Sequence, residues 1–284
     1  MNNLKRKLIK LIRKIHNYII YSFNNIFSFL FSRQILYTFN SYLYKYGLIG
    51  MGVNLDYNIK RSGEYKLLKK LLALYDNPIV FDVGANTGKY ALTVKDITSN
   101  ANIYAFEPHP INYKELEIIG NKHGINTYNL GLGEKLGVLK LYDYVIKDGS
   151  PRASIYEEVI KHMYGSDSIS HEIQISTVDD FVSNHNINYI NLLKIDVEGH
   201  ELSVIKGARK SIENNIIEVI QFEFNYTNII SRTYLYDFFK LLPNYNLYRL
   251  LRSGMIKIDN TPYNEIFLYQ NIIAIREDLE YNFN

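Results

Sequence analysis

The chain has 284 residues, of which 47% are hydrophobic and 14% aromatic, and it contains no cysteine. This length suits one α/β domain with an extension, and the hydrophobic content argues against extensive disorder. The absence of cysteine excludes disulfides, thiolate zinc sites and cysteine nucleophiles, and it agrees with a reducing cytosol.

Charge is distributed unevenly along the chain. No acidic residue precedes Asp56, whereas eight basic residues do: Lys5, Arg6, Lys7, Lys10, Arg13, Lys14, Arg33 and Lys45. This stretch has a charge of +8, and because the whole chain has +3, the remainder has about −5. Apolar residues recur there at steps of three or four residues or their multiples, namely Leu4, Leu8, Leu11, Ile12, Ile15, Ile19 and Ile26. The pattern predicts a basic amphipathic helical extension over residues 1–50, ahead of a domain over residues 51–284.

Two interpretations of this extension stay open. In the first, its apolar stripe packs on the domain or on a second copy of the chain. In the second, the helix lies in an anionic membrane surface through four aromatic side chains, Phe23, Phe27, Phe29 and Phe31. The run Tyr18 to Phe31 is too short and too interrupted for a membrane span, and no signal-peptide cleavage site follows it.

We therefore expect a cytoplasmic protein, which the second interpretation would place at the periphery of the membrane. No nucleic-acid partner is expected, because the basic residues are mixed with aliphatic positions rather than with exposed aromatic and polar ones.

Apolar runs that alternate with helical segments predict an α/β fold with a mostly parallel, doubly wound sheet. Strands are expected at Ile79–Val83, Asn102–Phe106, Asn126–Leu130, Leu192–Asp196 and Ile216–Phe222, and helices after Thr87, Pro110, Gly199 and Ser231. Sheets of this kind bind ligands above the carboxyl ends of their strands.

Two segments depart from the alternation. Between Lys135 and Thr177 we expect an insertion with strands at Val138–Tyr144 and Glu172–Val178 and a short helix around Tyr156–Tyr164. After Pro243, the runs Tyr245–Leu251 and Glu265–Ile275 are expected to form an antiparallel hairpin that closes the sheet.

The segment VFDVGANTG, Val80 to Gly88, is the most informative one. An apolar strand runs into Asp82 and then into a turn with the small residues Gly84, Ala85 and Gly88. A second strand ends about 20 residues later, the spacing of a Rossmann-like nucleotide site. These small residues let the backbone approach a ligand closely.

The second strand ends at Glu107, where a carboxylate can accept hydrogen bonds from two ribose hydroxyls. The turn is not a dinucleotide fingerprint, since it lacks G-x-G-x-x-G, and Asp82 and Asn86 crowd the place of a pyrophosphate. A nucleotide cofactor without phosphates fits better than NAD. S-adenosylmethionine is such a cofactor.

Carboxylates gather where the fourth strand ends, in KIDVEGHE. Asp196 and Glu198 are two residues apart and point to one side if the strand continues. Glu201 falls in the first turn of the next helix, where an acid often only complements the helix dipole. His200 lies between them, and Glu223 ends the fifth strand.

An alcohol that attacks a sulfonium methyl group must lose its proton. One of these carboxylates or His200 can take it as general base, or a divalent cation held by carboxylates can lower the pKa of the alcohol. We favour a base without a metal. Arg152, with Ser150 and Ser154, either binds a hydroxylated or anionic acceptor or forms an ordinary turn.

Five motifs occur in a characteristic order: DVGANTG, FEPHP, NLGLGEKLG, STVDDF and LLKIDVEGHELSVIKGA. From about residue 79 to about residue 225, this order resembles the FkbM family of S-adenosylmethionine-dependent methyltransferases. The resemblance implies a Rossmann-like class I methyltransferase fold. It implies cofactor contacts that include Pro108 and Asn129, and a catalytic Asp196. It also implies O-methyl transfer to a sugar-containing acceptor, a polysaccharide or glycolipid.

Two other functions are considered. An NAD-dependent sugar-modifying oxidoreductase is disfavoured by the Asp82 to Gly88 turn and by the lack of a Tyr-x-x-x-Lys pair near a catalytic strand. A noncatalytic membrane-associated scaffold that retains the fold is the other alternative. Cofactor binding and turnover would separate all three.

Overall fold

The computed structural model describes residue 18 and residues 20–279. The chain divides into two compact units, Met1–Met51 and Gly52–Asn284. In the first unit, residues 20–31 are helical, a 3-10 turn follows at Gln34–Leu36, and α2 spans Tyr37–Gly50. Of the predicted apolar stripe, the positions from Leu4 to Ile19 lie outside the described residues.

The aromatic residues of the first helix are largely exposed. Phe23 is 63% exposed and Phe29 69%, while Phe27 stacks on Phe31 with ring centroids 4.5 Å apart. Within the described residues, no helix combines the length and the apolar content that crossing a membrane requires.

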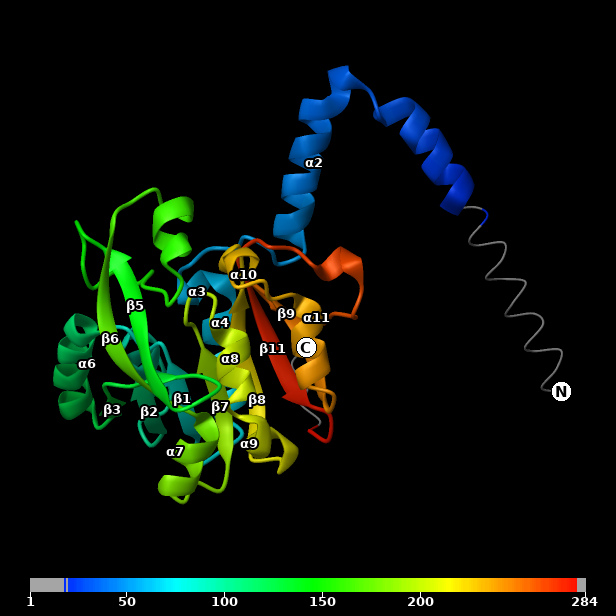
Figure 1. Cartoon of the computed structure of the whole chain (residues 1–284). Helices are drawn as coiled ribbons and strands as arrows, with labels where there is room; N and C mark the ends of the chain where they lie inside the picture. Colours follow the sequence, from blue (N-terminus) through cyan, green and yellow to red (C-terminus); the bar gives the residue numbers. More distant parts are fainter. Residues whose placement is uncertain (1–17, 19, 280–284) are drawn as a thin grey trace, which may run out of the picture. The chain divides into compact units, whose positions relative to one another are not determined.

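The second unit is built on an eight-stranded sheet (Figure 1). Its strand order is β10-β9-β11-β8-β7-β1-β2-β3. The strands are β1 (Ile79–Val83), β2 (Asn102–Phe106), β3 (Asn126–Tyr128), β7 (Ile190–Ile195), β8 (Ile217–Phe224), β9 (Tyr245–Leu251), β10 (Gly254–Lys257) and β11 (Gln270–Arg276). Pairs from β8 to β3 are parallel, and β11 is antiparallel to both its neighbours. The predicted α/β, mostly parallel fold is confirmed.

Successive residues of a strand point to opposite sides of the sheet, so apolar side chains lie on both faces, and helices cover both. Phe81 and Val83 pack on one face with α7 (Val178–Asn184), α8 (Glu201–Lys206), α9 (Arg209–Glu213) and α11 (Leu235–Leu241). Val80 packs on the other face with α4 (Glu64–Leu72), α5 (Lys89–Ile97) and α6 (Pro110–His123). The short helices α3 (Ile59–Ser62) and α10 (Thr227–Ile230) complete the unit.

The predicted insertion supplies β5 (Gly137–Tyr144) and β6 (Ser168–Ser176) of a separate sheet of order β4-β6-β5, and β4 (Gly131–Leu132) lies just before it. Figure 1 shows β5 and β6, in green, standing apart from the main sheet. Its own small apolar cluster consists of Leu141, Ile173 and Ile175. The short helix that we expected around Tyr156–Tyr164 is present as a π-helical turn at Val159–Met163.

Several expected strand boundaries differ from the structure, and three of the differences have a clear physical cause. The third strand stops at Tyr128, because the side-chain amide of Asn129 donates to the carbonyls of Glu107 and Pro108 (2.9 and 3.1 Å) and the chain then joins the second sheet. The strand expected to reach Val178 ends at Ser176, because Thr177 caps α7 by accepting the Asp180 N–H at 3.0 Å.

The third wrong boundary concerns the closing hairpin. β9 and β11 do pair antiparallel, but β11 begins only at Gln270, five residues later than expected. Inside the expected loop, Gly254 turns the chain back so that β10 pairs with β9 as an edge strand.

Candidate active site

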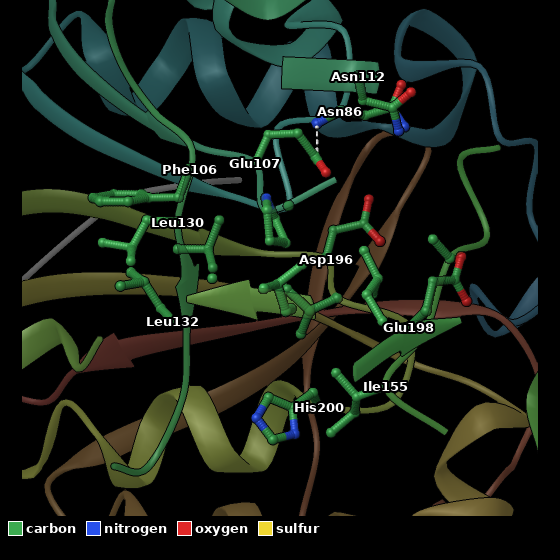
Figure 2. A pocket seen from close by; sticks show the side chains of 18 of the residues that line it. Asn86, Phe106, Glu107, Asn112, Leu130, Leu132, Ile155, Asp196, Glu198 and His200 are labelled. Atoms are coloured by element: carbon green, nitrogen blue, oxygen red, sulfur yellow. Dashed lines mark hydrogen bonds between the residues drawn. The ribbon is translucent and has the colours of Figure 1, made fainter. Parts of the chain in front are cut away.

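A pocket lies at the carboxyl ends of β1, β2 and β7, and the insertion supplies its outer wall. It holds about 740 Å³ of empty space, including its open mouth. Figure 2 shows the apolar side chains of Phe106, Leu130 and Leu132 on one side, and the carboxyl groups of Asp196 and Glu198 on the other. The pocket thus joins an apolar region to an acidic one.

The turn between β1 and α5 forms the pocket floor. Gly84 has φ +77°, and a Cβ atom added there would lie 1.8 Å from the carbonyl oxygen of Asp196, so only glycine fits. Asn86 also adopts a left-handed conformation, with φ +50°, and its N–H donates to Glu107 Oε2 at 2.8 Å. The turn therefore packs tightly against the end of β7.

Glu107 presents its carboxylate to the pocket, although it is only 5% exposed. Its other oxygen accepts the N–H of His109 at 2.8 Å. Burial raises the pKa of Glu107 to about 7, against the lowering effect of these two N–H donors. The group is anchored by backbone and has capacity for further hydrogen bonds from hydroxyl groups.

The apolar end of the pocket contains one orphaned polar atom. Leu132, Ile155, Ile173 and Ile175 line this end together with His200, whose buried Nδ1 has no hydrogen-bond partner. Burial lowers the pKa of His200 to about 4, so the imidazole is neutral at pH 7. A flat, uncharged ring with polar edges suits such surroundings better than a phosphate does.

Behind the carboxylates lies a buried ion cluster that the sequence analysis missed. Lys194 Nζ is 3.1 Å from Asp82 Oδ1 and 3.4 Å from Asp196 Oδ2, and it lies 5.2 Å from the centre of the Tyr90 ring. Burial lowers the pKa of Lys194, but the two carboxylates outweigh it and raise the pKa overall. The lysine is therefore a fixed positive charge.

Glu198 follows Asp196 at the pocket mouth in a strained backbone conformation, with φ +51°. The Ser154 hydroxyl, on the insertion, donates to the carbonyl of Glu198 at 2.8 Å and holds this turn. Burial and the neighbouring Asp196 raise the pKa of Glu198. The same two causes raise the pKa of Glu223, which is half-buried and takes a hydrogen bond of 3.3 Å from Asn225.

The structure brings many of the predicted residues together. The pocket lining includes four predicted cofactor residues and three predicted catalytic residues: Gly84, Asn86, Glu107, Pro108, Asp196, Glu198 and His200. Side chains from distant parts of the sequence thus converge at one edge of the sheet.

Other predicted residues have supporting positions. Asp82 is fully buried and paired with Lys194. Ala85 and Gly88 belong to the packed turn, and Asn129 holds the backbone of Glu107. Glu201 Oε1 accepts the N–H groups of Val197 and Gly199 at 3.2 and 3.1 Å, so it organises the turn that carries Asp196.

S-adenosylmethionine can be tested against these features. Glu107 can accept hydrogen bonds from ribose hydroxyls, and the apolar end with the orphaned His200 nitrogen suits an adenine. The acidic side of the pocket suits a cationic ligand rather than a phosphorylated one. The residues fit this cofactor.

Comparisons with known proteins agree. The family model described as methyltransferase FkbM domain matches residues 82–249, more than half of the chain. Hexuronic acid methyltransferase AglP of Haloferax volcanii is 29% identical over 167 residues, covering 55% of this chain and 62% of that protein. The 31-O-demethyl-FK506 methyltransferase FkbM of Streptomyces tacrolimicus is 25% identical over 176 residues, covering 54% and 68%.

A crystal structure of methyltransferase FkbM from Methylobacillus flagellatus aligns with a TM-score of 0.44 and 16% identity, covering 70% of this chain and 44% of that one. The matches span roughly two thirds of the length of the two curated relatives, 62% and 68%. Because the family model alone covers more than half of the sequence, the chain belongs to the FkbM family of methyltransferases, with a class I methyltransferase fold and S-adenosylmethionine as its cofactor.

Proposed function

We propose that this chain is an O-methyltransferase that transfers the methyl group of S-adenosylmethionine to a hydroxyl of a sugar-containing acceptor. The observation that carries the proposal is the position of Asp196. Its side chain lines the pocket and is 34% exposed, while its Oδ2 pairs with the buried Lys194. A carboxylate fixed on one oxygen can accept a proton on the other.

The bound cofactor supplies an electrophilic methyl group on a sulfonium. During methyl transfer, Asp196 would take the proton that the acceptor hydroxyl gives up as its oxygen is methylated. Lys194 fixes the orientation of Asp196, and Asp82 in turn fixes Lys194. Glu198 offers a hydrogen bond to a neighbouring hydroxyl of the acceptor.

Aromatic side chains around the acidic mouth support a sugar as acceptor. The Arg152 guanidinium lies 4.7 Å from the centre of the Tyr164 ring, and the hydroxyls of Tyr164 and Tyr226 share a hydrogen bond. Tyr57 is 72% exposed and packs on Tyr269 with ring centroids 4.4 Å apart. Aromatic faces can pack against the C–H groups of a pyranose, while carboxylates accept its hydroxyls.

The names of two relatives point the same way. One is called a hexuronic acid methyltransferase, and the other acts at an oxygen of its substrate according to its name. We extend the proposal to a glycolipid or polysaccharide as the molecule that carries the sugar.

The test uses methyl-labelled S-adenosylmethionine with polysaccharide and glycolipid fractions from the source cells, followed by hydrolysis to O-methyl sugars. The Asp196→Asn chain should lose about 100-fold or more in rate, the low end of the range for a lost general base, while its affinity for S-adenosylhomocysteine changes by less than about twofold. Absence of labelled O-methyl sugars, with label entering only protein or nucleic acid fractions assayed in parallel, would contradict the proposal.

Assays with added EDTA and with added magnesium distinguish a carboxylate base from a bound divalent cation. We expect the labelling rate to stay unchanged in both arms, because the proton is taken by a carboxylate in this proposal. Loss of the rate with EDTA and its rescue by magnesium would transfer the role to a bound cation.

We also propose that the first unit holds the enzyme at an anionic membrane surface. Its exposed aromatic side chains and the absence of any acidic residue before Asp56 favour anionic lipid headgroups over a basic or neutral partner.

A further inference from the structure

Two histidines and an aspartate meet where the insertion touches the main sheet's flank. His109, at the start of α6, has its Nε2 3.0 Å from Asp148 Oδ1. His171, on β6, has its Nε2 2.9 Å from the same oxygen. Asp148 lies in the segment that follows β5. We propose that this His109–Asp148–His171 clasp fastens the insertion over the cofactor, so that its members are positioning residues for S-adenosylmethionine binding.

The segment that carries Asp148 is itself a rigid part of the pocket. The Asp143 carboxylate accepts the N–H groups of Gly149 and Ser150 at 2.8 and 2.7 Å, and the Ser150 hydroxyl at 2.5 Å. Ser150 and Pro151 then line the pocket. Because residues 143–150 are tied into one loop, fixing Asp148 also fixes the pocket wall next to it.

His109 connects the clasp to Glu107, which lines the pocket. Its backbone N–H donates to Glu107 Oε1 at 2.8 Å, and its fully buried ring reaches Asp148. The carboxylate of Glu107 and the insertion loop are therefore joined through a single residue. A change in the position of the loop would therefore also change the orientation of Glu107.

The protonation of His109 favours hydrogen bonds over a metal ion. The donor atoms of the three residues lie within 4.8 Å of one another, a spacing that would also suit a cation. However, His109 Nδ1 accepts the N–H of Ile111 at 3.3 Å, so Nε2 carries the ring proton and donates it to Asp148. A metal at Nε2 would need the lone pair that this arrangement removes.

The proposal rests on the pocket binding S-adenosylmethionine, so the experiment measures both by calorimetry with S-adenosylhomocysteine. Asp148→Asn removes the negative charge that both histidines share, and it puts an NH₂ group in place of Oδ2, which lies 3.1 Å from His171 Nε2. We expect about tenfold weaker binding, within what loss of a charged hydrogen bond costs. Asp167→Asn, an exposed aspartate of the same insertion, is the matched control and should bind as the wild type does.

A second pair guards against simple misfolding. His171→Gln keeps an N–H donor for Asp148 and should bind nearly as the wild type does, whereas His171→Phe keeps the ring but no donor and should bind about tenfold more weakly. In the wild type, the ligand should slow hydrogen exchange at the amides of residues 149 and 150. In His171→Phe this protection should be lost.

Each contrary result has a distinct meaning. Equal affinities across all variants would overturn the clasp and leave the cofactor assignment standing. A wild-type chain that fails to bind S-adenosylhomocysteine would overturn both. Stoichiometric binding of Zn²⁺ to the wild type that disappears in Asp148→Asn would replace the hydrogen-bonded clasp with a metal site.

Discussion

Lys194 places one positive charge between two carboxylates, and one of them, Asp82, is completely buried. A buried carboxylate without its counter-charge is costly, so Asp82 depends on Lys194 for its ionised form. Asp196 uses the same lysine but reaches the pocket. The sequence motif presents Asp82 as a cofactor ligand. In the structure, Asp82 instead acts on the pocket through Lys194, which pairs with Asp196.

Removing that lysine should destabilise the fold. For Lys194→Met we expect a loss of about 3 to 5 kcal/mol in the free energy of unfolding, because an uncompensated charge remains buried. Urea denaturation at neutral pH measures it. The double variant Lys194→Met with Asp82→Asn should recover part of the loss, since the stranded charge is gone, and strictly additive losses would refute the pairing.

Without ligand, the buried Glu107 makes the folded chain less stable as pH rises, whereas a salt-bridged acid would make it more stable. Its pKa is raised to about 7 in the folded state, from 4.5 when exposed, so the folded chain holds this proton more tightly than the unfolded one. Stability from this group is fully present below about pH 4.5 and is lost as pH rises to about 7, an effect of order 3 kcal/mol. Glu201, whose pKa burial also raises to about 7, adds to the same trend.

In Glu107→Gln, the variant should therefore gain stability over the wild type as pH rises from about 5 to about 8, measured by urea denaturation without ligand. Binding of S-adenosylhomocysteine should show the reverse preference. Ribose hydroxyls donate to the ionised carboxylate, so wild-type affinity should increase through about pH 7, and the variant should lose this increase. A wild-type affinity that is flat over this range would remove Glu107 from the ribose contact.

Elements of the insertion act on the site at a distance in sequence. Ser154 is completely buried, and its hydroxyl holds the carbonyl of Glu198 in a turn whose backbone is strained. The second sheet is therefore both a wall of the pocket and a brace for the loop that carries Asp196.

Cutting this brace should change turnover more than cofactor affinity. For Ser154→Ala we expect a fall of about fivefold in kcat, equivalent to one lost hydrogen bond of about 1 kcal/mol, with S-adenosylhomocysteine affinity nearly unchanged. Ser170→Ala, at an exposed position of β6, serves as control. Equal effects of the two substitutions would show that the Ser154 contact has no part in catalysis.

The sequence allowed β1, β2, β7 and β8 to be located because each is an apolar run that ends at a polar residue or a glycine turn. It did not reveal β10, since this edge strand exists only through pairing with β9. The switch of the chain at Asn129 was equally hidden, because its hydrogen bonds go to backbone about 20 residues earlier in the sequence. Local patterns record periodicity and caps, whereas these features depend on distant partners.

The same contrast holds at the site. Glu107 and Asp196 were recognisable from their places after strands, and both line the pocket. Lys194 had one signal that was passed over: it is a cation next to the end of a fully buried strand, where a charge needs a partner. His171 and Asp148 carried no local signal, since only the second sheet brings them to His109.

At the scale of the whole molecule, each of the two units has its own composition. The hydrophobic clusters of the second unit draw their buried members from residue 67 onwards. The first unit exposes aromatic side chains such as Phe23, Phe29 and Tyr46. We therefore propose that the first unit determines where the enzyme is located and that the second unit carries out catalysis.

Deleting residues 1–51 should leave a folded domain that binds S-adenosylhomocysteine with unchanged affinity. The full chain should sediment with vesicles rich in phosphatidylserine at low salt, less so at high salt, because ions screen the lysine and arginine charges. Neutral phosphatidylcholine vesicles are the control. A truncated chain that unfolds, or a full chain that ignores anionic vesicles, would instead assign the apolar stripe to the core or to a dimer interface.

The chain enters and leaves the insertion side by side, since β4 and β6 pair in parallel, Gly131 opposite Ile175 and Leu132 opposite Ser176. Whatever lies between them begins and ends at one place on the main domain, so its length and shape can change without moving β1, β2 or β7. Domains inserted through adjacent ends are tolerated for this reason. The outer wall of the pocket can therefore be exchanged between relatives. Transfer of this segment to another member of the family should change its acceptor preference and leave the turn between β1 and α5 unchanged.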